Sequence, residues 1–169
     1  MALDLDQAVV VALGSNLKGA YASSEALLEA ALERFEAAGL RVAARSGWWR
    51  SAAWPDPAGP EYRNGVALVE TTLGPREVLA ALLAIEADLG RHRDERNAPR
   101  TLDLDLIAHG RTILDEPGLA LPHPRAQDRR VVMGPLAEIA PGWRHPASQW
   151  SAASLAKVAS VGADADPVE

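Results

Sequence analysis

The chain has 169 residues and a formal net charge of −6, so it suits one domain with an ordinary hydrophobic core and lacks the basic field that broad nucleic-acid or membrane-surface binding needs. It contains no cysteine, which excludes disulfides, zinc–thiolate sites and thiol nucleophiles. Neither a signal-peptide pattern nor an apolar run of membrane-spanning length stands out, and a cytoplasmic protein is therefore expected.

Hydrophobic periodicity, with glycine or proline at the boundaries, predicts four strands and two helices in the first part of the chain. The strands are expected over 8–13, 40–50, 64–72 and 101–106, and the helices between Ser23 and Gly39 and between Pro75 and Gly90. This order is that of the α+β ferredoxin-like βαββαβ sandwich, in which an antiparallel sheet carries both helices on one face.

The rest of the chain is expected to form a C-terminal extension of this sandwich. A rigid extended segment is predicted at 121–124, a helix over 129–140 and a last short helix over 151–160. Residues 1–160 are expected to form a single domain. The small and acidic residues 161–169 are expected to be a disordered tail.

The segment 91–106, RHRDERNAPRTLDLDL, carries most of the candidate chemistry. On a strand, Asp103 and Asp105 share one face at a spacing of roughly 7 Å, where both carboxylates can bind one or two hard cations. Four arginines within the first ten residues suit phosphate oxygens, because the planar guanidinium matches their geometry. A solvent-facing strand after a solvated arginine loop explains the same residues, so a site for metal and phosphate is one of two interpretations.

Two other segments offer contacts to an anion. His123 lies between two prolines in a second basic segment, HPRAQDRR, and can contact an anion there. Gly14-Ser15-Asn16 stands where a phosphate-binding loop could lie, although a turn before a helix explains it equally well. Neither a P-loop nor a dinucleotide-binding fingerprint is present.

Six motifs occur in one order along the chain: VALGSNL, YRN, LGR, APRTLDLDL, LPHP and PLAEIAP. Together they resemble the 6-hydroxymethyl-7,8-dihydropterin pyrophosphokinase family over about residues 9–141. The resemblance implies an ATP-dependent diphosphotransferase that moves a diphosphate from ATP to a pterin alcohol, releasing AMP, in folate biosynthesis. The alternative is a non-enzymatic pterin- or nucleotide-binding module on the same scaffold.

The resemblance also implies residues for the nucleotide and its metal. Asp103 and Asp105 would hold two Mg²⁺ ions that bridge the phosphates of ATP, while Arg91 and Arg100 would be catalytic and stabilise the transferred group. Contacts to ATP are implied for Glu86, Arg93, Leu106, His123 and Arg129. No general base stands out, because Asp103 can accept a proton only when it does not bind metal.

The implied contacts to the pterin are those of Ser51, Trp54, Tyr62, Asn64 and Val131. Asn64 would read the amide edge of the ring, and Ser51 and Trp54 belong to a proline-rich loop over 51–60. Val131 stands where the family commonly has a second aromatic residue, and it can pack on the ring but cannot stack. Trp54 is expected to compensate for that loss.

The arginine loop differs from the family pattern as well. Asn97-Ala98 stands where many members have Trp-Gly, so the contacts and closure of this loop transfer least well from the family. The altered loop is the reason for the non-enzymatic alternative. The expected partners are ATP and a pterin alcohol, with no nucleic acid and no membrane, and the oligomeric state is left open.

Overall fold

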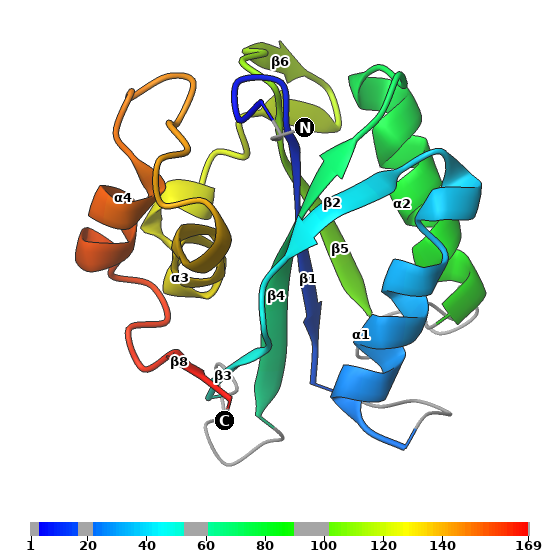
Figure 1. The fold of residues 1–169 in the computed structure, drawn as a ribbon, viewed down its shortest axis with the longest axis horizontal. Helices are drawn as coiled ribbons and strands as arrows, with labels where there is room; N and C mark the ends of the chain where they lie inside the picture. The colour runs from blue at the N-terminus through cyan, green and yellow to red at the C-terminus, as the bar shows by residue number, and fades with distance from the viewer. Residues whose placement is uncertain (1–3, 17–21, 53–60, 90–101, 169) are drawn as a thin grey trace.

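The computed structural model describes residues 4–16, 22–52, 61–89 and 102–168. The chain forms three layers, with α1 and α2 on one face of a central sheet and α3 and α4 on the other (Figure 1). The elements, in which η denotes a 3-10 helix, follow in the order β1 (Val9–Ser15), α1 (Ser24–Glu33), η1 (Glu36–Ala38), β2 (Arg41–Arg45), β3 (Trp49–Ser51), β4 (Tyr62–Glu70), α2 (Pro75–Leu89), β5 (Asp103–His109), β6 (Leu114–Glu116), β7 (Leu119–Leu121), η2 (Ala126–Asp128), α3 (Arg130–Ile139), α4 (Ala152–Val158) and β8 (Asp166–Pro167).

The main sheet is antiparallel throughout, with the strand order β5-β1-β4-β3-β8 and with β2 also paired to β4. β1 lies in the interior of the sheet because both of its neighbours, β4 and β5, pair with it over most of its length. β6 and β7 form a separate two-stranded sheet. The predicted α+β class, with an antiparallel sheet and packed helices, is confirmed.

The strand predicted over 40–50 is two strands, β2 and β3, that both pair with β4. Between them the ladder is interrupted: the N–H of Val66 donates to the hydroxyl of Ser46 at 2.9 Å, and the N–H of Gly47 donates to the carboxylate of Glu138 at 2.7 Å. The helix predicted after Ser23 is confirmed, since the Ser23 hydroxyl accepts from the N–H of Ala26 at 3.0 Å as an N-cap. Gly39, with a φ of +88°, ends the 3-10 turn that follows this helix.

Two hydrophobic cores lie on the two faces of the sheet. The first, between the sheet and α1 and α2, includes Leu27, Phe35 and Leu82. The second, between the sheet and α3 and α4, includes Met133, Leu136 and Trp143. The C-terminal extension therefore covers the face that a two-layer sandwich with all its helices on one side leaves open.

The segment after residue 160 packs on the fold, where the sequence predicted a disordered tail. Val161 and Arg130 share a backbone hydrogen bond of 2.9 Å, and Ala165 is fully buried. β8 pairs with β3, and the N–H of Val168 donates to the carbonyl of Trp48 at 2.8 Å. These backbone pairings, which composition does not reveal, order the small and acidic residues.

In the described part of the chain, no helix is long and apolar enough to cross a membrane.

Candidate functional site

β5 presents two carboxylates on one face, as its sequence pattern predicts. Leu104 and Leu106 are buried in the core beside α2, while Asp103 and Asp105 are half-buried on the opposite face. Among the residues that the structure describes, β5 is the edge strand of the main sheet, and no strand of that sheet pairs with its outer side. A bulge at Ile107 shifts the register against β1 and turns both Ile107 and Ala108 into the second core.

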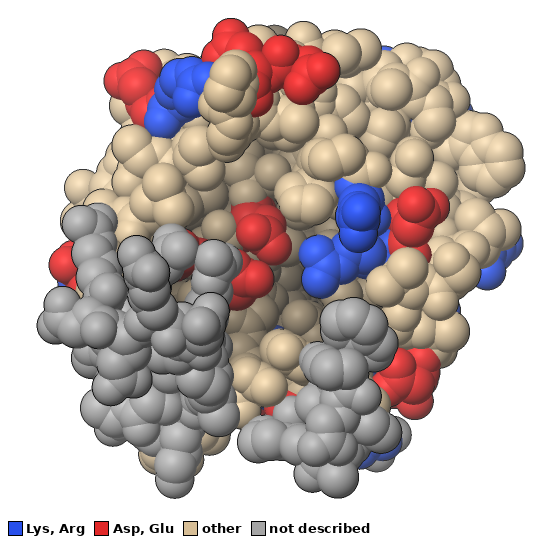
Figure 2. Space-filling model, turned by 180° about the vertical axis from the view of Figure 1, so that it is seen from behind, with Lys and Arg blue, Asp and Glu red and all other residues tan. Residues whose placement is uncertain are grey.

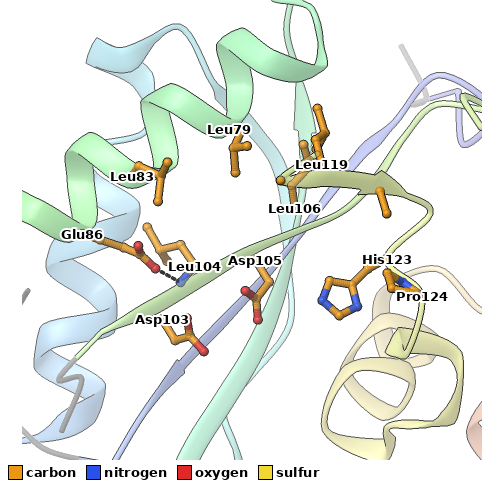
Figure 3. Close-up of a pocket in the computed structure, with 12 residues that line it drawn as sticks. Leu79, Leu83, Glu86, Asp103, Leu104, Asp105, Leu106, Leu119, His123 and Pro124 are labelled. Carbon is orange, nitrogen blue, oxygen red and sulfur yellow. Dashed lines mark hydrogen bonds between the residues drawn. The ribbon is translucent and has the colours of Figure 1, made fainter. Parts of the chain in front are cut away.

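A pocket with a volume of about 360 Å³ lies along this edge of the sheet. Its lining comes from α2, β5 and the segment around β7, and consists of Leu79, Leu83, Glu86, Asp103, Leu104, Asp105, Leu106, Gly118, Leu119, Ala120, His123 and Pro124. Asp105 and His123 point toward each other across the pocket, and Asp103 lies next to Asp105 on the same strand (Figure 3). The structure thus brings together five of the predicted nucleotide and metal residues: Glu86, Asp103, Asp105, Leu106 and His123.

His123 is placed beside β5 by its own backbone. Its N–H donates to the carbonyl of Ile107 at 2.8 Å, and its ring Nδ1 accepts from the N–H of Arg125 at 3.3 Å. Burial lowers the pKa of His123 below its ordinary value; the positive charges of Arg129 and Arg125 lower it further, against the opposing charge of Asp103. The ring is therefore neutral at pH 7, and the accepting Nδ1 leaves Nε2 as the atom that carries the proton.

Glu86 is almost completely buried at 2% exposure, which is unusual for a carboxylate. Its Oε2 atom accepts from the backbone N–H of Leu104 at 2.7 Å, between the two aspartates of β5 (Figure 3). Glu86 therefore connects α2 to the outer edge of β5 and satisfies an edge-strand donor. The sequence resemblance pointed to the nucleotide instead, and that role stays a prediction.

Asn64, one of the residues predicted to contact the pterin, lies on the same face of the sheet as the aspartates, two strands away. The strand register places Asp103, Gly14, Asn64 and Trp49 in one row across β5, β1, β4 and β3. Asn64 donates from its side-chain amide to the hydroxyl of Ser51 at 3.3 Å. The aspartates and the Asn64–Ser51 pair thus flank one strand whose residue in this row has no side chain.

Sequence reasoning missed the part that Gly14 plays in this row. A Cβ atom at Gly14 would lie 3.0 Å from the side-chain oxygen of Asn64, so a larger residue would displace that side chain. The sequence pattern predicted that Gly14 belongs to a phosphate-binding loop or a turn, whereas Gly14 lies inside β1. The available signal was the alternation in β1, which puts Gly14 on the face opposite Leu13.

The remaining pterin candidates are placed as follows. Tyr62 begins β4 and pairs with Ser51, and it shares the face of Asn64. Val131 lies in the first turn of α3, half-buried against the second core. Arg129 precedes that helix as its N-cap residue, and its charge acts on His123. Trp54, Arg91, Arg93 and Arg100 lie outside the described residues, so their roles stay predictions.

The charges on this face are separated. Seen from behind, the molecule has acidic side chains in a hollow, and a group of basic side chains faces them from one side (Figure 2). Carboxylates bind hard cations and arginine suits phosphate, so such a surface can hold a metal–polyphosphate complex. An acidic pair, a neutral histidine and nearby arginines around a pocket are typical of enzymes that transfer phosphoryl groups with the help of a divalent metal.

Comparison with known proteins gives the family. The model of the 7,8-dihydro-6-hydroxymethylpterin-pyrophosphokinase (HPPK) family matches residues 10–141. The chain is 45% identical to the 2-amino-4-hydroxy-6-hydroxymethyldihydropteridine pyrophosphokinase of Synechocystis sp. over 140 residues, which cover 82% of this chain and 69% of the relative. It is also 45% identical to the protein of the same name from Pseudomonas aeruginosa, over 83% of this chain and 85% of the relative. The chain belongs to the HPPK family.

Solved structures agree on the fold. A Plasmodium falciparum HPPK-DHPS triple mutant superposes with a TM-score of 0.68 at 14% sequence identity. The superposition covers 89% of this chain but only 44% of the Plasmodium chain. At this identity the likeness shows a shared fold and carries nothing further about activity.

Proposed function

We propose that this protein transfers a diphosphate from ATP to 6-hydroxymethyl-7,8-dihydropterin and releases AMP, as a step of folate biosynthesis. Family membership over residues 10–141 supports the reaction. The observation that carries the proposal is the pair Asp103 and Asp105 in the pocket at the edge of β5, in one row with Asn64. The pterin alcohol and ATP are the two substrates.

Asp103 and Asp105 fit a Mg²⁺ site by their chemistry, because they offer carboxylate oxygens from one face of a rigid strand. Among the described residues, no group of three or more His, Cys, Asp or Glu side chains could hold a metal. Mg²⁺ commonly binds through one or two carboxylates together with substrate phosphates, which suits such a sparse set. We assign two ions to this pair, and when bound they neutralise the charge of the triphosphate.

The protein contributes mainly alignment to the transfer. In the reaction, the hydroxymethyl oxygen bonds to the β-phosphorus of ATP and loses its proton to water, and the bond from that phosphorus to the oxygen of the leaving AMP breaks. Asn64 and Ser51 hold the pterin, and the aspartates hold the triphosphate two strands away, roughly 10 Å across the sheet. The row of residues therefore places the pterin and the triphosphate side by side on one face of the sheet, so that they can meet end to end.

Further side chains bind and orient the phosphates. The neutral His123 donates from Nε2 to a phosphate oxygen, and Arg129 adds positive charge beside it. We propose that Arg91 and Arg100 stabilise the negative charge of the transferred group and that Arg93 makes a further contact with ATP. Tyr62 and Val131 pack against the pterin from β4 and α3, and we assign a further pterin contact to Trp54.

We further assign the core to the ferredoxin-like βαββαβ sandwich. The order β5-β1-β4-β2, antiparallel throughout, supports this assignment, with β3 as an added short strand on β4. The two hydrophobic cores share one sheet, which supports a single domain over residues 1–160. A cytoplasmic location remains part of the proposal.

The assay that tests the function is AMP release from ATP and Mg²⁺ in the presence of the pterin alcohol. Asp103→Ala and Asp105→Ala should each reduce turnover by roughly 100-fold or more, since either change removes a metal-binding carboxylate. Asp115→Ala is the matched control, because Asp115 is an exposed aspartate on β6 outside the pocket. Circular dichroism should show an unchanged fold for all three variants.

Absence of AMP above background with the unaltered protein would overturn the proposed function. If the protein nevertheless bound the pterin alcohol tightly, it would be a binding module on the same scaffold. Wild-type turnover by both aspartate variants would refute the metal assignment alone.

A further inference from the structure

One face of α3 packs against the indole ring of Trp49. Arg130, Gly134 and Glu138 are spaced four residues apart and so line one side of the helix. The guanidinium of Arg130 lies 5.7 Å from the ring centroid, and a Cβ atom at Gly134 would fall 2.6 Å from a ring carbon. The ring therefore lies directly against the backbone of α3.

Glu138 completes this contact with both of its carboxylate oxygens. Oε1 accepts from the indole Nε1–H of Trp49 at 3.0 Å, and Oε2 accepts from the backbone N–H of Gly47 at 2.7 Å. A carboxylate can accept both hydrogen bonds at once, whereas a glutamine must turn its NH₂ group toward one of the two donors. The PLAEIAP motif that contains Glu138 has no role in the proposed transfer.

The two donors that Glu138 binds belong to β3 and the residues just before it, on the side of the site proposed for the pterin. Trp49 is buried in β3 and pairs with Asn64 across the ladder to β4. Ser51 follows two residues later on the same face and accepts from the Asn64 amide. β3 has only three residues, so few ladder contacts fix its position. A displacement of Trp49 would therefore move Ser51 relative to Asn64.

We propose that Glu138 is a positioning residue for the pterin: it fixes Trp49 and Gly47 so that β3 presents Ser51 to Asn64. This inference rests on the proposed function, because it assumes that the Ser51–Asn64 pair contacts the pterin. Glu138 itself touches neither substrate. Glu138 therefore affects the affinity for the pterin and leaves the affinity for ATP unchanged, since the aspartates of β5 lie on the other side of β1.

Glu138→Gln tests the inference with the smallest change in shape. By calorimetry, with Mg²⁺ and a non-hydrolysable ATP analogue present, the Kd for the pterin alcohol should rise about fivefold, because one charge-assisted hydrogen bond at the protein surface is lost. The Kd for the ATP analogue alone should stay unchanged. Trp49→Phe, which keeps an aromatic ring but removes the indole donor, should weaken pterin binding in the same direction.

A matched control exists on the opposite face of the sheet. Glu29 accepts from the indole of the neighbouring Trp48 at 3.1 Å and pairs with Arg45 at 2.6 Å. Trp48 packs toward Gly65 and the first core rather than toward α3. Glu29→Gln therefore perturbs the same type of contact and should leave both affinities unchanged.

Nuclear magnetic resonance gives a readout that does not depend on substrate. The chain has five tryptophans, so a ¹⁵N-labelled sample shows up to five indole N–H signals. The signal that disappears in Trp49→Phe belongs to Trp49, and Glu138→Gln should shift that signal while the other indole signals move less. Unchanged pterin affinity despite this shift would refute the positioning role. So would an equal loss of ATP affinity, which would indicate a general structural role.

The outcomes separate the inference from the proposed function. If the unaltered protein binds the pterin alcohol but releases no AMP, the function fails while the affinity comparison still decides the role of Glu138. If the unaltered protein does not bind the pterin alcohol, both fail.

Discussion

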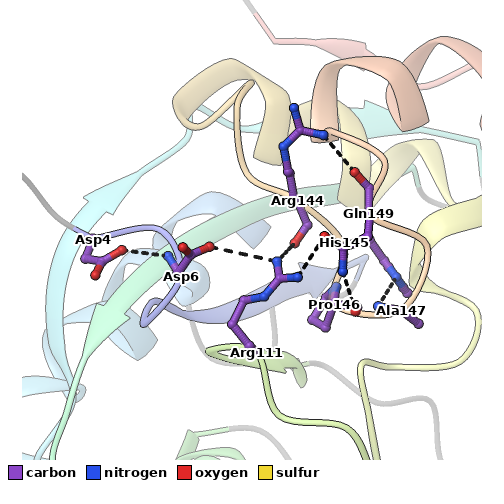
Figure 4. A network of polar contacts seen from close by, with 8 residues as sticks. All are labelled: Asp4, Asp6, Arg111, Arg144, His145, Pro146, Ala147 and Gln149. Atoms are coloured by element: carbon purple, nitrogen blue, oxygen red, sulfur yellow. Dashed lines mark hydrogen bonds and ion pairs between the residues drawn. The ribbon is translucent and has the colours of Figure 1, made fainter.

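His145 is a buried histidine that does not line the proposed active-site pocket and lies in the loop between α3 and α4. Its Nδ1 atom accepts from the backbone N–H groups of Ala147 at 3.2 Å and Ser148 at 3.1 Å. The loop is connected to the start of the chain through Arg111, which donates to the carbonyl of Arg144 and pairs with Asp6 (Figure 4). Neutral imidazole is required for this arrangement, because a protonated Nδ1 cannot accept.

The pH dependence of stability follows from His145. Burial lowers the pKa of His145, and the charge of Arg111 lowers it further. His145 therefore binds a proton more readily in the unfolded chain than in the folded protein. Its contribution to the free energy of unfolding is fully present above the ordinary pKa of 6.5 and is lost as the pH falls below that value toward the pKa of the folded state. Thermal unfolding between pH 7.5 and 5.5 should show this loss in the unaltered protein.

His145→Asn is the variant that isolates this effect. Asparagine can accept from a backbone N–H two residues on but does not titrate, so its stability should depend less on pH over the same range. The pKa of His123 is lowered in both proteins, so the contribution of His123 to the pH dependence of stability cancels in the comparison. Equal pH dependence of the two proteins would contradict the prediction.

At the scale of the element, β5 is an edge strand, and the outward N–H of Leu104 donates to a side chain instead of to another strand. Glu86 from α2 accepts from Leu104 and so fixes the strand segment that carries both aspartates. Glu86→Ala should lower the free energy of unfolding by about 1–3 kcal/mol, because a buried donor loses its acceptor. Glu86→Gln keeps an acceptor oxygen and should cost less.

Hydrogen exchange of the Leu104 amide measures this contact directly. The amide should exchange faster in Glu86→Ala than in the unaltered protein, and Glu86→Gln should fall between them. Asp88→Ala is a control on the same helix, since the side chain of Asp88 is 64% exposed and forms a surface pair with Arg34. If the Leu104 amide exchanged at the same rate in all variants, Glu86 would have no part in fixing β5.

At the scale of the whole molecule, the C-terminal segment connects the layers. Arg130 in α3 donates to the carbonyl of Ala165, and Asp164 accepts from the N–H of Ala52 at 2.7 Å. Removing residues 161–169 should lower the melting temperature by roughly 5 °C, because several backbone hydrogen bonds and the β8 pairing are lost. Asp164→Ala, which removes the bond to Ala52 but keeps the backbone pairings of the segment, should lower it less. An unchanged melting temperature after the deletion would show that this segment adds nothing to the fold.

Local patterns made much of the architecture predictable. The alternation from Leu102 to Leu106 predicted which face of β5 carries the aspartates, and the Ser23 cap and Gly39 marked the ends of the first helical region. Glycine and proline around the second helix marked its limits equally well, since α2 runs from Pro75 to Leu89. In each case the signal lies within a few residues of the feature that it predicts.

Contacts between distant residues were not predictable in this way. The bond between Glu138 and Trp49 joins residues 89 apart, and no periodicity in either segment indicates it. The same holds for Glu86 and Leu104, where a buried carboxylate accepts from a backbone N–H 18 residues away. The covered second face of the sheet was missed because the predicted sandwich carries its helices on one face, and the pattern of residues 129–140 does not indicate which face α3 covers.

The row from Asp103 through Gly14 to Asn64 has a consequence for variation among related proteins. The separation between the two ends of the site is a multiple of the spacing between paired strands, which hydrogen bonds keep nearly constant. Insertions or substitutions in the surrounding loops can therefore change how tightly each substrate binds without changing the reach between them. A larger residue at Gly14 would displace the side chain of Asn64 at one end of the site, even though the strand spacing and every residue that touches a substrate stayed the same.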